Sequence, residues 1–400
     1  MSHDELSPAT VATLDEMARV AADGNAGWMS LPPESYTDPD IYRLEIEKIF
    51  KTTWLNIGRI DEVSQRGSYV AHEVAGTPIA MVRGQDDQLR VFANICQHRW
   101  MKLLEGKGRK AVITCPYHAW AYGTDGVLRR APGMEQHPSF KPDCVRLEKL
   151  NHEIWQGFVF VNLDGKAAPL APRLTGLDER ISEFRLESWS TARTINHGEV
   201  PWDWKVMQDN GECYHHEGLH PQTFQKVFPG ERSRCVVDGD WIFQWNPARE
   251  EILETSAAGE KVFPGLFFKP MDGLTEFQRT NFHLFYVLPN YLFYVQPDCG
   301  IAIRCLPTGS GRMHMETDLL VPPGARDLPD FEERLDQLDA FFNTFNDEDT
   351  TANSAIQKAL DSGRAHRAPL SHLEAHNRHV AWWIADKLTV DREAAAVAAE

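Results

Sequence analysis

Two short segments in the first third of the chain each carry one cysteine and one histidine. Cys96 with His98 and Cys115 with His118 form the pattern C-x-H-x16-C-x2-H. We expect each pair to lie at the end of a β-strand, so that each loop supplies one thiolate and one imidazole. A [2Fe–2S] cluster with two cysteines on one iron and two histidines on the other requires this set of ligands. Neutral imidazole in place of thiolate raises the reduction potential of such a cluster, which suits an electron relay.

A structural zinc site is the alternative interpretation of the same four residues. Zinc sites with two cysteines and two histidines usually have C-x-x-C in one loop and H-x3–5-H in another. In this chain cysteine and histidine alternate, which favours the iron–sulfur cluster. A non-enzymatic, zinc-stabilised binding protein is kept as a second hypothesis. Such a protein would be colourless, whereas a protein with the iron–sulfur cluster would be red-brown.

The composition indicates an acidic globular chain long enough for two domains. Its 400 residues include 41 Lys and Arg against 58 Asp and Glu, which gives a net charge of −17. This charge argues against nucleic acid or an anionic membrane as the main partner, because both need clustered basic residues. We find no apolar run of the ~18–20 residues typical of a membrane-spanning helix and no signal peptide. The 7 thinly spread cysteines favour reduced thiols, so we expect a cytoplasmic protein.

The pattern of apolar residues predicts an α+β fold with antiparallel pairing, because a strand-rich part precedes a part that ends in helices. After helices at 7–22 and 40–54, short strands are predicted at 68–74, 79–83, 89–93, 111–114 and 158–162. The second half has polar helical sequence around 204–220 and strands at 241–245, 281–287, 292–296, 301–306 and 314–321. Three helices are predicted at 330–346, 347–362 and 371–388.

A second group of potential metal ligands follows position 204. His215, His216, His220 and Glu212 fall within nine residues. On an ideal helix Glu212, His216 and His220 share one face, because they are spaced by four residues. His215 and His220 are five residues apart, which requires a distorted turn or a π-bulge. Spacing alone does not choose the ligands.

The first motif resembles a known family. Residues Asn94–Arg99 (NICQHR) and Cys115–Tyr122 (CPYHAWAY) closely resemble the Rieske domain of Rieske non-haem iron oxygenases. Respiratory Rieske proteins, which carry an additional cysteine in each cluster loop, are less similar. The chain departs from the family at Gln97, where Pro is usual, and at Trp100, where Gly is usual. Neither position is a ligand, but a Trp100 next to the cluster is placed to affect the docking of an electron donor or of a neighbouring subunit.

The second motif resembles the same family. Residues Glu212–Pro221 (ECYHHEGLHP) are similar to its catalytic motif, in which two histidines five residues apart bind a mononuclear Fe(II). The resemblance therefore implies that His215 and His220 are iron ligands and that His216 is a neighbour of the site.

The third iron ligand is implied by the segment 346–360, which resembles the family segment that supplies a carboxylate. The spacing between the acid and the following Gln357 selects Asp349 over Asp347 and Glu348. Asp349 would complete a 2-His-1-carboxylate triad that leaves positions open for O2 and substrate. An acidic helix N-terminus, which the helix dipole favours, is the alternative explanation of these acids.

Glu212 lies where the family has its bridging carboxylate. In the family, the Rieske domain lies next to the catalytic iron of a neighbouring subunit in a trimer, and the bridging acid hydrogen-bonds a histidine at each centre. Glutamate at this position is found in members similar to carnitine and glycine-betaine oxygenases. The segment from Lys205 to His215 is one residue shorter than in these relatives, so no ligand role is carried over to Asp209 or Asn210.

The resemblance implies the domain organisation and the function. We expect an N-terminal segment (1–38) that packs on the catalytic domain, an all-β Rieske [2Fe–2S] domain (39–163) and a helix-grip-type antiparallel-sheet catalytic domain (164–400). The expected protein is a terminal mono- or dioxygenase that takes electrons from a separate NAD(P)H-dependent reductase with flavin or iron–sulfur centres. We find no GxGxxG motif in a βαβ context, so the chain itself is not expected to bind the nicotinamide. A homotrimer is expected, with a small β subunit as an optional further partner.

The expected reaction is hydroxylation or oxidative N-demethylation of a small organic substrate, with a quaternary amine favoured. Aromatic side chains around 241–245 and 282–293 suit a quaternary ammonium through cation–π attraction, or a stacked aromatic ring. An aromatic-acid ring hydroxylase of the same family is therefore the alternative. A Rieske ferredoxin that only carries electrons is a hypothesis from another class, but it would need only about the first 160 residues.

Overall fold

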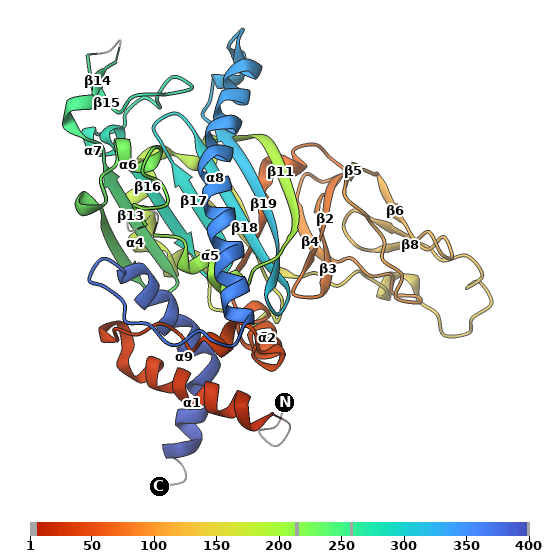
Figure 1. Cartoon of the computed structure of the whole chain (residues 1–400). Coiled ribbons are helices and arrows are strands. Elements are labelled where there is room, and N and C mark those ends of the chain that lie inside the picture. Colours follow the sequence, from red (N-terminus) through yellow and green to blue (C-terminus); the bar gives the residue numbers. More distant parts are fainter. Residues whose placement is uncertain (1–5, 213–215, 257–258, 398–400) are drawn as a thin grey trace. The chain divides into compact units, whose positions relative to one another are not determined.

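The computed structural model describes residues 6–212, 216–256 and 259–397. The chain divides into two compact units, one of residues 51–170 and the other of the residues up to Phe50 together with those from Ala171 onward (Figure 1). Small antiparallel sheets form one unit, and a large antiparallel sheet with helices forms the other, which confirms the predicted α+β class. The domain limits 1–38, 39–163 and 164–400 stay a prediction.

The unit of residues 51–170 is built from three small antiparallel sheets. Their strand orders are β1-β10-β9, β4-β3-β2-β5 and β6-β7-β8. The strands are β1 (Leu55–Arg59), β2 (Ser68–Val74), β3 (Thr77–Arg83), β4 (Leu89–Ala93), β5 (Lys107–Arg109), β6 (Val112–Thr114), β7 (Ala121–Gly123), β8 (Leu128–Arg130), β9 (Asn151–Trp155) and β10 (Phe158–Asn162), with short helices η5 (Ile60–Val63) and η6 (Pro142–Cys144). Cys96 and Cys115 belong to the same buried core as Tyr69, Phe92 and Trp120. The two sulfur atoms of the first motif are therefore enclosed by the unit's own hydrophobic core.

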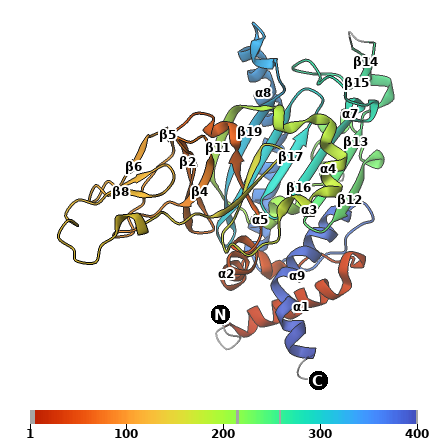
Figure 2. The same ribbon diagram turned by 180° about the vertical axis from the view of Figure 1, so that it is seen from behind.

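The larger unit is organised around one antiparallel sheet with the strand order β11-β19-β18-β17-β16-β13-β12. Its strands are β11 (Ser190–Val200), β12 (Arg234–Asp238), β13 (Trp241–Pro247), β16 (Asn281–Val287), β17 (Tyr291–Val295), β18 (Gly300–Gly309) and β19 (Arg312–Val321), and β14 (Glu254–Thr255) pairs with β15 (Lys261–Val262) outside it. The central strands β16 and β17 are buried along their whole length. Helices cover both faces of the sheet, α8 (Phe331–Asp361) on one and α4 (Thr175–Ile181) on the other (Figures 1 and 2).

Helix α8 is continuous, although the sequence predicted two helices that meet at 346/347. The segment contains neither Gly nor Pro, so nothing in it interrupts the helix. Its buried residues are spaced by three, four or seven positions, that is by one or two helical turns, and form one stripe: Phe331, Leu335, Leu338, Phe342, Asp349, Asn353 and Gln357. The stripe is apolar in its first half and polar in its second. The sheet therefore receives a hydrophobic helix face at one end and a set of buried polar groups at the other.

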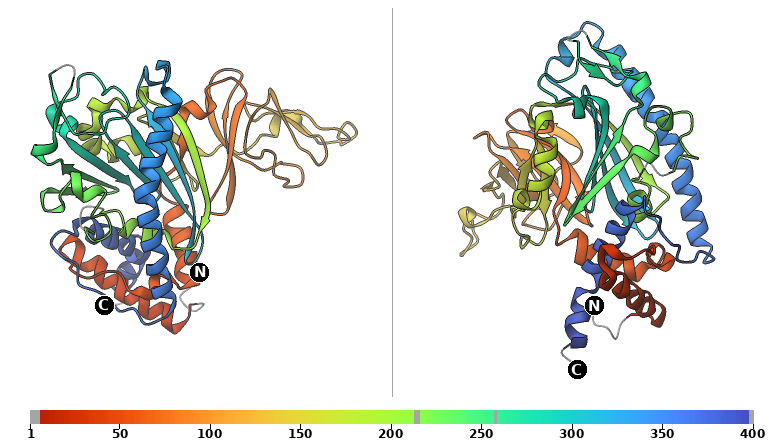
Figure 3. Two further views of the ribbon diagram at one scale, coloured as in Figure 1. Left: turned by 45° about the horizontal axis from the view of Figure 1, so that its top comes forward. Right: turned by 90° about the vertical axis from the view of Figure 1, so that its left-hand side faces the viewer.

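The N-terminal helices pack on the same unit. Helix α1 (Pro8–Asp23) lies across α9 (Ala375–Val397) (Figure 3). Ser7 caps α1 by accepting a hydrogen bond from the backbone of Thr10, and Pro8 occupies the first helical position, where proline is favoured. The remaining helices are η2 (Gly24–Ala26), η3 (Pro33–Tyr36), α2 (Pro39–Glu45), η4 (Ile46–Phe50), α3 (Leu170–Arg173), η7 (Ser182–Phe184), η8 (Leu186–Ser188), α5 (Trp204–Asp209), α6 (Phe224–Val227), η9 (Gly230–Arg232), η10 (Glu250–Ile252), α7 (Glu276–Thr280) and η11 (Ala325–Asp327). Among the described residues, no helix has both the length and the apolar character needed to cross a bilayer.

A buried ion cluster fixes helix α5. The Nζ atom of Lys205 lies 2.6 Å from Glu45 Oε1 and 2.7 Å from Asp203 Oδ1, and all three side chains are almost fully buried. The backbone N–H of Asp203 donates to Gln357 Oε1 of α8 at 2.9 Å. The cluster therefore joins α2, α5 and α8, and it sets the point from which the segment after Asp209 departs.

We predict that Lys205→Met destabilises the protein by about 3–5 kcal/mol, because it removes the cation that two buried carboxylates share. Urea-induced unfolding followed by circular dichroism measures the loss. The matched control is Lys358→Met, which removes an exposed lysine of α8 and should change stability by less than about 0.5 kcal/mol. Equal effects of the two variants would contradict a structural role for the cluster.

Candidate metal centres

Both loops of the first motif fold into the same turn. The backbone N–H of Cys96 donates to Met101 O at 2.9 Å, and the N–H of Trp100 donates back to Cys96 O at 3.1 Å. The second loop repeats both bonds from Cys115, at 2.8 and 3.1 Å. The fourth residue after each cysteine, Trp100 or Ala119, has a positive φ of 59° or 56°. This left-handed position explains why a glycine is favoured there, and at Trp100 it leaves the indole 80% exposed.

The two turns bring the four predicted cluster residues together. The rings of His98 and His118 are 4.7 Å apart, and the His98 ring stacks on Trp120 at 4.6 Å. Cys96 and Cys115 are only 1% and 2% exposed. Burial raises the pKa of the Cys96 thiol above its ordinary value. A contact of 3.4 Å with the Tyr122 hydroxyl opposes this rise only in part. The thiols therefore lie inside the unit and the imidazoles lie nearer its surface.

The atoms of this group fit a cluster as their ligand. In the described part of the chain, His98 Nδ1 is buried and has no hydrogen-bond partner. A buried polar atom without a partner is costly, and a bond to iron would satisfy it. Two buried thiols next to two imidazoles also provide the ligand set of a mixed Cys2His2 [2Fe–2S] cluster.

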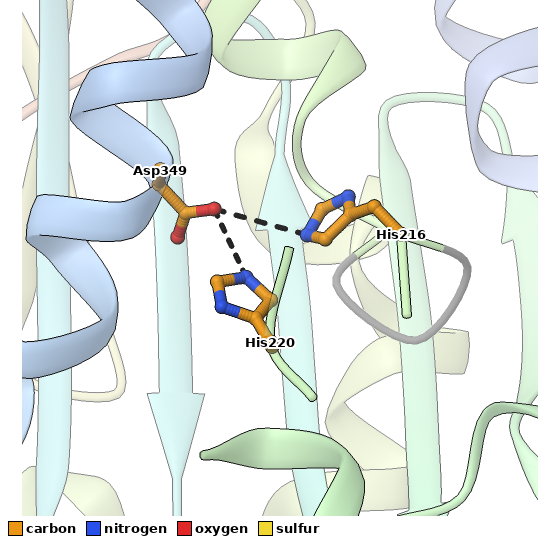
Figure 4. Close-up of side chains that lie close together, drawn as sticks. All are labelled: His216, His220 and Asp349. Carbon is orange, nitrogen blue, oxygen red and sulfur yellow. Dashed lines mark hydrogen bonds and ion pairs between the residues drawn. The ribbon is translucent and has the colours of Figure 1, made fainter. Parts of the chain in front are cut away.

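The second centre lies in the larger unit, where His216, His220 and Asp349 each offer one ligand atom within 4.8 Å of the others (Figure 4). Asp349 Oδ1 is 3.1 Å from His220 Nε2 and 3.8 Å from His216 Nε2. Asp349 comes from the middle of α8, and both histidines come from the turns that follow α5. Two ligands at right angles, each about 2.1 Å from one ion, are about 3.0 Å apart. The spacing of Asp349 and His220 therefore matches that of neighbouring ligands of one metal ion.

Glu348 orients His220 from the other side of the ring. Its Oε2 atom lies 2.6 Å from His220 Nδ1 and accepts a hydrogen bond from Thr223 Oγ1 at 2.9 Å. A carboxylate only accepts, so Nδ1 carries the ring proton and Nε2 is left to face Asp349. Burial lowers the pKa of His220, but the hydrogen bonds and charges of Asp349 and Glu348 raise it above its ordinary value. The arrangement favours positive charge at Nε2, as a proton or as a metal ion.

The residues predicted from the sequence for this centre have different outcomes in the structure. His215, the ligand implied by the resemblance, lies outside the described residues, and the histidine that the structure brings to Asp349 is His216. The predicted helix around 204–220 ends at Asp209, and turns follow it. Asp349 lies eighteen residues inside α8, so the alternative of an acidic helix N-terminus is wrong. The role of Glu348 was missed, because helix spacing does not reveal that two adjacent acids reach opposite sides of one ring.

The two acids that precede the histidines in the sequence, Asp209 and Glu212, have different surroundings. Asp209 accepts a hydrogen bond of 2.5 Å from the Tyr36 hydroxyl, so its carboxylate is engaged by the N-terminal segment. Glu212 is 7% exposed, and its Oε1 lies 4.0 Å from His216 Nδ1. In the described part of the chain, Glu212 Oε2 is buried and has no hydrogen-bond partner. Burial raises the pKa of Glu212 to about 8, although hydrogen bonds with the backbone and with Asn377 oppose the rise.

The sequence matches known families over most of its length. Residues 182–390 match the family described as ring hydroxylating alpha subunit (catalytic domain), and residues 53–141 match the Rieske [2Fe-2S] domain. The chain is 30% identical over 355 residues to the carnitine monooxygenase oxygenase subunit of Escherichia coli K12, which covers 85% of this chain and 86% of that protein. It is 26% identical over 398 residues to the glycine betaine monooxygenase oxygenase subunit of Chromohalobacter salexigens, covering 92% and 86%.

Solved structures show the same fold. A quaternary ammonium Rieske monooxygenase in complex with γ-butyrobetaine is 26% identical, with a TM-score of 0.74 over 93% of this chain and 98% of that chain. Naphthalene 1,2-dioxygenase from Rhodococcus sp. is 20% identical, with a TM-score of 0.77 over 96% and 99%, and this likeness concerns the fold alone. The chain therefore belongs to the ring-hydroxylating oxygenase α subunits, the Rieske non-haem iron oxygenases of class EC 1.14, which combine a Rieske [2Fe–2S] domain with a mononuclear iron site.

Proposed function

We propose that this chain is the terminal oxygenase of a two-component system and that it hydroxylates a small N-methylated substrate, a quaternary amine. In this reaction the substrate, O2, two electrons and two protons give the hydroxylated product and water. Hydroxylation of an N-methyl carbon is followed by loss of formaldehyde, which amounts to oxidative N-demethylation. The observation that carries the proposal is the presence, in one chain, of a Cys2His2 group and a separate group of histidines with a buried carboxylate.

We assign Cys96, His98, Cys115 and His118 to the [2Fe–2S] cluster. When bound, the cluster passes single electrons, and a mononuclear Fe(II) supplies the site of O2 chemistry. The buried Cys96 and Cys115 would hold the cluster from inside the unit, and the more exposed His98 and His118 would hold it on the side nearer solvent. Exposure of the imidazoles shortens the distance that an electron has to travel through protein.

We assign His220 and Asp349 to the mononuclear iron, with Glu348 as the residue that orients His220. For the third ligand the two lines of support differ. The motif, with two histidines five residues apart, favours His215, whereas the spacing of 3.8 Å to Asp349 favours His216. We retain His215, because the resemblance extends through Glu212 and Pro221 on both sides of it.

Glu212 is proposed to bridge the two iron centres across a subunit boundary in a homotrimer. Its buried Oε2 atom has no partner among the described residues, and an imidazole of a neighbouring chain would satisfy it. A carboxylate between two imidazoles orients both rings and offers a short bonded path for an electron.

A separate reductase is the proposed source of electrons, since the relatives named above are oxygenase subunits of monooxygenases. The reductase is proposed to use NAD(P)H through flavin and iron–sulfur centres. Hydroxylation of an aromatic acid is the second candidate function, supported by the phenylalanine-rich cavity next to His220.

Oxygen consumption tests the proposed function directly. The protein, purified anaerobically with iron, is mixed with a reductase and NADH and offered quaternary amines and aromatic acids in turn. We expect a quaternary amine to start O2 uptake and to release formaldehyde, with product mass confirming the change. Uptake only with aromatic acids would move the function to the second candidate, and no uptake by protein with full iron would reject both.

We predict that the wild-type protein holds three irons per chain, against two for an electron carrier, and that His215→Ala holds two. The variant should keep the visible spectrum of the Rieske cluster, because the mononuclear site alone is changed. Iron analysis and absorption spectra measure both properties. The matched control is His216→Ala, which should keep three irons, and loss of iron in that variant alone would transfer the ligand to His216.

We predict that Glu212→Gln keeps all iron and slows turnover by roughly 10–100-fold, because the substitution replaces one of two acceptor oxygens with an NH2 donor, which cannot accept a hydrogen bond from the second imidazole. Stopped-flow measurement of cluster reoxidation by O2 and substrate locates the loss in electron transfer. Glu217→Gln, an exposed acid of the same segment, is the control and should leave the rate unchanged. Equal reoxidation rates in the two variants would remove the bridging role.

A further inference from the structure

We propose that the substrate carries a carboxylate and that Lys226 holds this group at the entrance of the cavity next to His220. The opposite end of the substrate, which is to be hydroxylated, would then lie between aromatic rings on the side of the iron ligands. This inference rests on the proposed function and names the class of substrate on which the same site acts.

The cavity has the size and lining of a small-molecule site. It measures about 320 Å³, and His220 forms part of its wall. Six aromatic side chains line it: Phe224, Phe228, Phe282, Tyr294, Phe341 and Phe345. The rings of Phe224, Phe228 and Phe282 contact one another at centroid distances of 5.1–5.4 Å. Cavities of this size bind ligands largely through such apolar walls and orient them with a few polar groups.

Lys226 is the charged group of this lining. The lining contains no aspartate or glutamate. Lys226 is exposed, and no carboxylate of the described residues lies within ion-pair distance of it. The nearby acid Glu348 already accepts hydrogen bonds from His220 and Thr223 through its Oε2 atom. Lys226 is therefore a solvent-exposed cation in the lining of a cavity whose other residues are mostly apolar, so we place its ammonium group on the solvent side of the cavity.

This distribution of charge discriminates between substrates. A carboxylate meets Lys226 in a charge-assisted hydrogen bond, which is stronger than a bond between neutral groups. At the other end, an N-methylated cation gains cation–π attraction from the phenylalanine rings, and an aromatic ring gains edge-to-face contacts. A substrate with a positive charge and no carboxylate receives no such bond and is repelled by Lys226.

Both candidate substrate classes of the proposed function include molecules with a carboxylate, namely betaines and aromatic acids. The inference therefore separates acids from their uncharged or purely cationic analogues, whichever of the two classes is turned over. The probes are γ-butyrobetaine and phenylacetate, each paired with its methyl ester, which keeps the shape and removes the negative charge.

The test uses the holoenzyme and three variants. Lys226→Met removes the charge and keeps the aliphatic stem, Lys226→Arg restores a cation, and Lys261→Met removes an exposed lysine outside the cavity as a control. Dissociation constants from isothermal titration calorimetry are measured for each acid and ester, and KM and kcat are measured for every probe that supports O2 uptake.

We expect Lys226→Met to weaken binding of at least one acid on the order of 10–100-fold, the usual effect of losing a bond to a charged group. Binding of the ester should change less than about twofold, kcat should be retained, and Lys226→Arg should restore the affinity. Equal losses for acid and ester, or no loss for either, would overturn the inference.

The binding measurement also separates this inference from the proposed function. Charge-dependent binding of an acid without any O2 uptake would reject the function and support the role of Lys226. Turnover that is indifferent to Lys226 would support the function and reject the role. Failure of every acid to bind the wild-type protein would reject the role of Lys226, and the proposed function would then be decided by O2 uptake with quaternary amines that lack a carboxylate.

Discussion

The arrangement of this protein depends on one buried carboxylate in the middle of a long helix. Asp349 continues the apolar stripe with which α8 packs on the sheet, so packing of the helix forces its side chain against His220. Glu348 holds the opposite side of the same imidazole. A buried carboxylate such as Asp349 is costly unless positive charge neutralises it. Folding therefore creates a place that favours a cation, and helix α8 determines where that place is.

The two iron centres are built by different means. In the unit of residues 51–170, two hairpin-like turns with the same hydrogen bonds present a buried thiol and a more exposed imidazole each. In the larger unit, distant elements bring the candidate ligands together, because the histidines follow α5 and the acid lies in α8. Local turns suffice for the first centre, while the second requires the complete sheet and the ion cluster of Lys205, Glu45 and Asp203 that anchors α5.

The aromatic cavity and the candidate metal centre of the larger unit share one residue. His220 belongs both to the proposed iron site and to the wall of the aromatic cavity, so whatever occupies the cavity is adjacent to the reacting centre. The aromatic rings provide apolar contact area, and Lys226 is the proposed group that distinguishes the two ends of an occupant.

The sequence by itself determined the features that depend on neighbours in the chain. The spacing of Cys96, His98, Cys115 and His118 predicted the group that the structure brings together, and alternation predicted strands such as β2, β4 and β16. Local pattern could not show that α8 is continuous, that Glu348 orients His220, or that residues from 220 to 345 enclose one cavity. Those features arise from contacts between segments far apart in sequence, whose free energy is realised only when the sheet and its helices pack. Only the tertiary structure therefore decided which acids face His220 and which charged residue, Lys226, lines the cavity.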